Sequence, residues 1–373
     1  MTYNCFRVSD IIFKALCGLA AFFMVIFWVF KFQENEDVSA ISYASYETDR
    51  NIIYPELSIC ITEPFIYQNL LWTWPGNDSL KNYRSYIAGR SKFRKEYEQV
   101  DFFNVTLNIF DYVQNVRLYM RNVNAHKPLI CKTLGHCPYV KFKNNFNGLS
   151  NGMILRCFGF EVNLKTAGDV KALHVSFNRK LGDAFRTVLR SGISYIHLVF
   201  NYPGQMLKTI ENYQPVWENQ GSSQFLDITS SSIEILRRRN KNNEPCFADR
   251  KNFDETVLRI HHDAVGCRPP YHQSDTPVCI SETKLNESRY EINEIGNRYL
   301  PPPCEEISNI AFKADELPLD KIRKKGPRFY FTYPKKMKII QQIKSVDLHS
   351  LIGNIGGYIG LFLGKLKGFD IQM

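Results

Sequence analysis

The sequence predicts an α+β membrane protein, with an N-terminal transmembrane helix and a disulfide-rich extracellular domain built on β-strands. Three observations predict it: an apolar run near the N-terminus, eight cysteines that all follow this run, and short alternating segments far apart in the chain. The chain has 373 residues, of which 44% are hydrophobic, so it can bury a large core and is not a disordered chain. Its mean hydropathy of −0.27 excludes a polytopic transporter, because most of the chain must lie in water.

The apolar run covers residues 11–30 and contains Lys14 as its only charge. Twenty helical residues span about 30 Å, which is the thickness of the hydrocarbon core of a bilayer. A cleaved signal peptide is the alternative, but its processing site at 38–40 lies too far beyond the run, after three acidic residues. We therefore predict an uncleaved transmembrane helix at 11–32.

The charges around this helix predict its orientation. Arg7 and Lys14 mark the N-terminal side, whereas Glu34, Glu36 and Asp37 follow on the other side. The positive-inside rule then places a short N-terminus, residues 1–10, in the cytosol. Residues 33–346 form the extracellular domain of a plasma-membrane protein.

Glycosylation motifs and cysteines agree with this orientation. N-glycosylation sequons lie beyond the helix at Asn77, Asn104 and Asn286. Eight of the ten cysteines also lie beyond it, and an even number in an oxidising compartment indicates four disulfides. Cys5 and Cys17 lie on the cytosolic or membrane side and are expected to be free.

Alternating apolar and polar residues predict strands in the extracellular part, at 55–61, 173–177, 195–202, 226–236 and 328–333. These segments are far apart, so their pairing must be non-local. Residues 240–305 contain four cysteines and several prolines, which indicates a disulfide-braced subdomain.

The sequence contains none of the HExxH, GxSxG, P-loop, CxxC or DxD signatures, so we predict a protein that is not an enzyme and needs no cofactor. Cys131, His136 and Cys137 could hold a metal, but a disulfide beside a bystander histidine is the stronger prediction. His261 and His262 are adjacent and are expected at the surface. No metal site is predicted.

The net charge of +10 is concentrated in two places. One is Arg237–Arg239, and the other is residues 321–344, which contain nine basic residues and no acid. Nucleic acid is excluded as a partner because both places are extracellular. A solvated face or a contact with lipid headgroups is expected instead.

A second apolar segment lies near the C-terminus. The uncharged part, residues 351–364, has fourteen residues and spans about 21 Å, too short to cross a bilayer alone, and Lys365 and Lys367 end it. Glycines repeat every four residues within it, which predicts a face that packs closely against other membrane helices. The set comprises Gly353, Gly356, Gly357, Gly360 and Gly364. A nucleotide-binding loop is excluded because no strand–turn–helix pattern surrounds these glycines.

Four segments, in order along nearly the whole chain, resemble the epithelial sodium channel, degenerin and acid-sensing ion channel family, in particular its invertebrate members. They are Tyr54 to Cys60 after the first helix, Tyr202 to Gln205 in a mid-domain turn, Gly266 to Tyr271 around a cysteine, and Leu351 to Gly364 in the second helix. The last segment is the most specific of the four.

The resemblance implies a trimeric, amiloride-sensitive, sodium-selective cation channel subunit for passive Na+ transport. The lipid bilayer and other subunits, identical or different, would be its partners. It implies an ectodomain of palm, β-ball, finger and thumb, with 240–305 as the thumb-like region. It also implies the disulfides Cys60–Cys157, Cys131–Cys137, Cys246–Cys304 and Cys267–Cys279. Ser350 falls at the gating-sensitive position outside the pore.

Departures from the family concern the pore. The filter of the family is Gly-x-Ser, whereas here Gly364 is followed by Lys365 and Leu366. In a trimer, three lysines near the filter would oppose cations. The inner half of the second helix is absent, so residues 347–373 predict a truncated second helix and an incomplete pore. The alternative function is a non-conducting partner or binding ectodomain that associates with full-length subunits; a splice form or an incomplete gene model is a third explanation.

Overall fold

The structure is a computed structural model that describes residues 2–45, 47–66, 79–121, 128–131, 137–150, 153–163, 165, 168–181, 183–184, 196–208, 214–217, 225–249, 251–289, 295, 298–317 and 327–370. The chain divides into two compact units. One unit contains residues 1–41 and 341–373, and the other contains residues 42–340. The boundaries fall within two strands, β1 (Asp37–Ala44) and β13 (Met337–Lys344).

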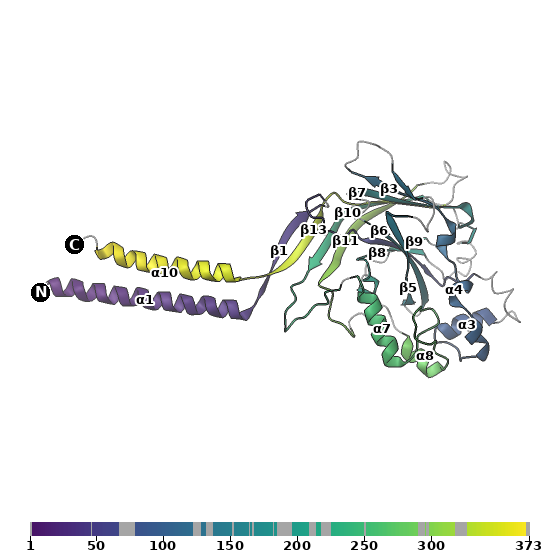
Figure 1. The fold of residues 1–373 in the computed structure, drawn as a ribbon, viewed down its shortest axis with the longest axis horizontal. Coiled ribbons are helices and arrows are strands. Elements are labelled where there is room, and N and C mark those ends of the chain that lie inside the picture. The colour runs from purple at the N-terminus through teal and green to yellow at the C-terminus, as the bar shows by residue number, and fades with distance from the viewer. Residues whose placement is uncertain are drawn as a thin grey trace. The chain divides into compact units, whose positions relative to one another are not determined.

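The first unit contains the two long helices, α1 (Thr2–Glu34) and α10 (Leu348–Asp370), which lie side by side (Figure 1). Helix α1 includes the predicted span at 11–32 and already begins at Thr2. Helix α10 continues past residue 364 to Asp370. Just before α10, the amide of Ser345 donates a hydrogen bond to the carbonyl of Glu36 at 2.9 Å. The ammonium of Lys344 lies 3.2 Å from the ring centroid of Phe32.

The second unit is built on two β-sheets. The eight-stranded sheet has the order β1-β13-β10-β12-β7-β3-β4, and β11 pairs with β10 off this path. Its remaining strands are β3 (Val113–Met120), β4 (Leu129–Cys131), β7 (Val170–Phe177), β10 (Phe225–Arg237), β11 (Glu305–Leu317) and β12 (Arg328–Thr332). The pair β10–β12 is parallel, so a crossover must connect these strands.

The five-stranded sheet has the order β5-β6-β2-β8-β9. Its strands are β2 (Glu56–Thr62), β5 (Val140–Ser150), β6 (Met153–Val162), β8 (Ile196–Asn201) and β9 (Gln214–Trp217). All residues of β2 are buried, because β6 and β8 flank it on both edges and packed layers cover it. The five predicted strands are confirmed as β2, β7, β8, β10 and β12.

One hydrophobic core joins the two sheets. Phe200 from β8 packs against Phe331 from β12 and Phe312 from β11, with ring centroids 4.6 Å and 5.1 Å apart. Each buried aromatic side chain of this size contributes a few kcal/mol of hydrophobic stabilisation. The core therefore holds the sheets together as one α+β unit.

Helices cover the rest of this unit. They are α3 (Ser79–Ile87), α4 (Phe102–Val105), α7 (Phe253–Val265) and α8 (Glu282–Ser288), with 3-10 turns at Lys95–Gln99, Ile109–Tyr112 and Met206–Lys208. Helix α7 buries one face at helical spacing, formed by Phe253, Val257, Leu258, His261 and His262.

Candidate functional site

Helix α1 presents apolar side chains to its surroundings. Within its segment Ile12–Glu34, a window of 18 residues has a mean hydropathy of 2.3, and among the described residues α1 is the one helix long and apolar enough to cross a membrane. Eight large apolar side chains of this segment are exposed, by fractions from 41% at Phe13 to 65% at Phe23. A core helix of a soluble domain would bury these side chains, so α1 does not have that role.

Helix α10 begins with a side-chain cap at Ser350, the residue predicted to be gating-sensitive. The Asp347 carboxylate accepts a hydrogen bond from the Ser350 amide at 2.6 Å, and the Asp347 carbonyl accepts one from Leu351. Sequence reasoning missed this cap, although an aspartate three residues before Ser350 and just ahead of an apolar run is a recognised start signal.

The glycines of α10 lie open. A Cβ built on Gly353, Gly356, Gly357 or Gly360 would have no atom of the described chain within 4 Å. Nearby apolar side chains are exposed as well, with fractions of 61% at Ile352 and 56% at Leu361. The close packing predicted for these glycines is therefore not made within the described part of this chain.

The residues predicted to form the filter lie further along α10. Gly364, Lys365 and Leu366 belong to this helix, and their side-chain surroundings are outside the described part. The predicted roles of these residues and of Ser350 stay predictions.

The structure contains four disulfides, and they join the same pairs that the family resemblance implies. They are Cys60–Cys157, Cys131–Cys137, Cys246–Cys304 and Cys267–Cys279. Cys60 and Cys157 lie directly opposite each other on β2 and β6. Cys17 is free, and the side chain of Cys5 lies outside the described part.

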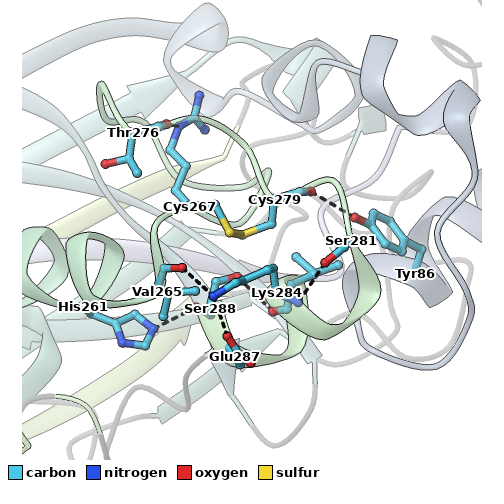
Figure 2. Close-up of a disulfide and its surroundings, with 12 residues drawn as sticks. Tyr86, His261, Val265, Cys267, Thr276, Cys279, Ser281, Lys284, Glu287 and Ser288 are labelled. Carbon is cyan, nitrogen blue, oxygen red and sulfur yellow. Dashed lines mark hydrogen bonds and ion pairs between the residues drawn. A yellow bond between two sulfur atoms is a disulfide. The ribbon is translucent and has the colours of Figure 1, made fainter.

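The thumb-like region is organised around the Cys267–Cys279 bond (Figure 2). Helix α7 ends at Gly266, whose φ of 83° favours glycine, and the chain turns there into Cys267. Lys284 on α8 donates a hydrogen bond to the Val265 carbonyl at 3.1 Å, which ties the end of α7 to α8. These bonds fix α7, the disulfide loop and α8 as one body.

Helix α3 packs on the other side of this disulfide. The Tyr86 hydroxyl donates to the Cys279 carbonyl at 3.4 Å (Figure 2). Tyr86 stacks on Tyr97 with ring centroids 5.0 Å apart, and both belong to a buried cluster with Tyr83, Phe102 and Tyr271. The region around α3 and the thumb-like region therefore share one aromatic core.

The prediction that His261 and His262 lie at the surface is wrong. Both are buried, with exposed fractions of 2% and 1%. One ring nitrogen of His261 lies 3.0 Å from the Tyr299 hydroxyl, and the other lies 3.0 Å from the Ser288 carbonyl. Helical residues one position apart differ by about 100°, so a wide buried face can hold both.

His262 faces a third histidine, His272, with ring centroids 4.8 Å apart. Burial, together with His261 and the nearby Arg268, lowers the pKa of His262 to about 4. Burial, together with His262, Arg268 and His261, lowers the pKa of His272 to about 3. The pair is therefore neutral at pH 7. No cluster of three metal-ligating side chains occurs within the described ranges.

A glycine and a carboxylate attach α7 to the sheet. Gly204 has a φ of 80°, and a Cβ there would lie 1.9 Å from the Lys251 carbonyl oxygen. The Asp254 carboxylate accepts hydrogen bonds from the amides of Met206 and Leu207 at 2.5 Å and 3.1 Å. The turn at Tyr202 to Gln205 is one of the four segments that resemble the channel family. This turn, which follows β8, is therefore where the start of α7 contacts the sheet.

The expectation of a solvated arginine face at Arg237–Arg239 is wrong for the first two residues. Arg237 lies 3.4 Å from the Glu305 carboxylate, and Arg238 lies 2.5 Å from that of Glu306. All four side chains are less than a quarter exposed. The acids come from β11, which pairs with β10, and the sequence spacing gave no sign of this match. Within 321–344, Lys338 forms an ion pair with Glu234 at 2.9 Å.

A buried carboxylate lies on β2. Glu56 is fully buried, and its carboxylate is 3.5 Å from the ammonium of Lys143, which also pairs with Glu161. Burial raises the pKa of Glu56 to about 7, more than Lys143 lowers it. Glu56 therefore titrates near neutral pH.

Two of the three predicted glycosylation sites can be located. Asn104 and Asn286 are both exposed, and the Asn286 side chain accepts a hydrogen bond from Arg289. Asn77 and His136 lie outside the described residues.

Comparisons with known proteins add little. No family model and no curated protein matches the chain. Among solved structures, 27 chains match, one of them described as a proton-activated chloride channel determined by cryo-EM. It shares 9% identity with a TM-score of 0.29, over 98% of this chain and 96% of that chain. At this TM-score the likeness carries no argument about function.

Proposed function

We propose that this chain is a subunit of a trimeric, sodium-selective, amiloride-sensitive cation channel of the epithelial sodium channel, degenerin and acid-sensing ion channel family. The N-terminus lies in the cytosol, and residues 33–346 form an ectodomain outside the plasma membrane. One observation carries the proposal. Two long helices, α1 and α10, come from the two ends of the chain and lie side by side, and in the sequence a four-disulfide α+β unit separates them.

The surface of these helices supports a membrane assembly of more than one chain. The apolar side chains of α1 need a lipid or protein environment, which a single chain in water does not supply. The open glycines of α10 can accept a neighbouring helix at close range. Two or more subunits meeting at α10 would fill this face.

Lys365 supports a second candidate, a non-conducting partner of other subunits. It follows the last glycine of the α10 repeat, where the family filter begins. Three ammonium groups around one narrow constriction oppose cation entry. We therefore expect little Na+ current from this chain alone.

Membrane topology is tested first. The full chain is expressed in cultured cells and treated with a glycosidase that removes N-linked sugars. A shift in mobility that is lost only when Asn77, Asn104 and Asn286 are all replaced by Gln places the ectodomain outside the cell. An unglycosylated chain with a protease-protected ectodomain would contradict the proposed orientation.

Conduction is tested by whole-cell recording in Na+ with and without amiloride. We compare wild type, Lys365→Ala, and Lys367→Ala as the matched control. A current that appears with Lys365→Ala and not with the control supports a channel subunit whose filter lysine blocks cations. If the wild type reduces the current of a co-expressed full-length subunit, it acts as a non-conducting partner. If it neither conducts nor associates with such a subunit, the proposal is wrong.

A further inference from the structure

A polar cavity of about 280 Å³ lies on the eight-stranded sheet. None of its lining residues belongs to α1 or α10. Three neighbouring strands, β3, β7 and β12, supply its lining. The lining residues are Gln114, Asn115, Arg117, His174, Ser176 and Arg328.

The strand register explains why these residues meet. Arg117 pairs with His174 across β3 and β7, and in the adjacent row Asn115 and Arg328 both pair with Ser176. Because side chains alternate along a strand, these residues share one face of the sheet. The intervening residues Val116, Val175 and Phe329 are buried in the hydrophobic core on the other face.

The cavity carries positive charge without a compensating acid. Within the described ranges, neither Arg117 nor Arg328 forms an ion pair, and no Asp or Glu lines the cavity. Asp227 on β10 pairs with Tyr330, which lies two residues beyond Arg328 on β12. Asp227 does not line the cavity. Burial and the Arg117 charge lower the pKa of Arg328, and burial with both arginines lowers the pKa of His174 to about 4. Two guanidinium groups thus repel each other across the site.

Buried polar atoms in the lining also lack partners. His174 is 8% exposed, yet its Nδ1 atom has no hydrogen bond within the described part of the chain, and the same holds for Arg117 Nε and Asn115 Oδ1. The orientation of the Asn115 amide can be reversed to present a donor. Buried polar groups are nearly always satisfied, so the unsatisfied atoms here indicate a ligand that accepts hydrogen bonds.

We propose that this cavity binds a small oxyanion, of the phosphate or carboxylate class, from the extracellular side. The guanidinium fork of arginine matches the paired oxygens of such an anion, and neutral His174 can donate one more hydrogen bond. A halide offers a single centre and cannot satisfy both forks in this way. The site is independent of which ion the chain conducts, or whether it conducts.

The test uses the purified full chain in detergent, titrated calorimetrically with sodium phosphate and sodium acetate at constant ionic strength. Sodium chloride serves as the reference anion. We expect saturable binding of at least one oxyanion and none of chloride at the same concentration. Arg117→Gln and Arg328→Gln should each weaken binding by about tenfold or more, the effect of losing one charged hydrogen bond. Arg259→Gln, which alters an exposed arginine on α7, should bind as the wild type does.

Thermal melting separates a binding role from a structural one. If the two arginines form an anion site, Arg328→Gln in chloride alone should melt at or above the wild-type temperature, since it removes repulsion. Oxyanion should raise the wild-type melting temperature and leave that of the variant unchanged. Equal binding of phosphate, acetate and chloride, or full binding by Arg328→Gln, would overturn the site. If the Arg328→Gln variant is unfolded even without any added anion, Arg328 has a structural role and not an anion-binding one.

Discussion

His262 and His272 lie with their rings 4.8 Å apart beside the Cys267–Cys279 bond, in the body that joins α7 to α8. Both are buried and both have pKa values far below the ordinary value of about 6.5. Arg268 and His261 add to the positive surroundings, and Asp263 is the acid that favours protonation of His262.

Acid is expected to destabilise the thumb-like region. In the unfolded chain these histidines become protonated below about pH 6.5. In the folded chain His262 becomes protonated only near pH 4 and His272 only near pH 3. The free energy of unfolding therefore falls as the pH drops from about 6.5 towards these values. The loss should be on the order of 1–2 kcal/mol per histidine at pH 5. Hydrogen exchange of residues 253–289 at pH 7 and pH 5 measures it.

A phenylalanine at one of the two rings should reduce this effect. His262 Nε2 makes no hydrogen bond within the described residues, so His262→Phe removes a titrating group and little else. Exposed His349 supplies the matched control, His349→Phe. If hydrogen exchange of residues 253–289 increases with acid as much in His262→Phe as in wild type, this histidine pair is not the cause of the acid sensitivity.

Glu56→Gln is expected to stabilise the chain at alkaline pH. The pKa of Glu56 in the folded chain is about 7, above the ordinary value for a glutamate. The protonated form of Glu56 therefore stabilises the folded chain at low pH. This stabilisation is lost as the pH rises through 7. Lys143 keeps Glu161 as its partner in the variant. We expect a gain on the order of 1–3 kcal/mol at pH 8 and little change at pH 5. Melting curves at both pH values check this, with exposed Glu255→Gln as control; a loss of stability at pH 8 would contradict it.

The two disulfides of the thumb-like region should differ in their contribution. Cys246–Cys304 closes a loop with a sequence separation of 58 residues, whereas Cys267–Cys279 closes one of 12. A longer loop restricts the unfolded chain more, so removing the first bond should cost about 1 kcal/mol more than removing the second. Paired Cys→Ser variants, compared by melting temperature, measure the difference. An equal or reversed order would mean that native packing dominates.

Phe200→Ala tests the junction between the sheets. Phe200 is fully buried and contacts aromatic rings of both β11 and β12, so its removal leaves a cavity between the two layers. We expect a loss of about 3–5 kcal/mol in the free energy of unfolding. Ile280→Ala, at a side chain that is 63% exposed, should change stability by less than a quarter of that.

The sequence predicted strands where apolar and polar residue types alternate, and this includes β2 and β8, whose residues are all buried. Strand β12 alternates in its burial, whereas in β7 the residue types alternate although nearly every residue is buried. Strand β6 lies between β5 and β2 and is buried at nearly every residue, but its residue types do not alternate and it was not predicted. Alternation of residue type along the strand, rather than its burial, therefore decided which strands the sequence predicted.

The candidate sites depend on pairing that a single sequence does not display. The acids that neutralise Arg237 and Arg238 lie some 68 positions away on β11. Likewise, the oxyanion cavity joins residues near 115, 174 and 328 only through the register of three strands. The capping role of Asp347, by contrast, is a local pattern and was open to prediction.

Two glycines in the left-handed region set different limits on what evolution can place there. At Gly266 an added Cβ would meet empty space, so an asparagine could occupy the position at modest conformational expense. At Gly204 the backbone of Lys251 occupies that space, so any side chain would push apart the turn and the start of α7. A saturation library should therefore keep a few residue types at position 266 and only glycine at position 204, which makes this turn the less adaptable of the two.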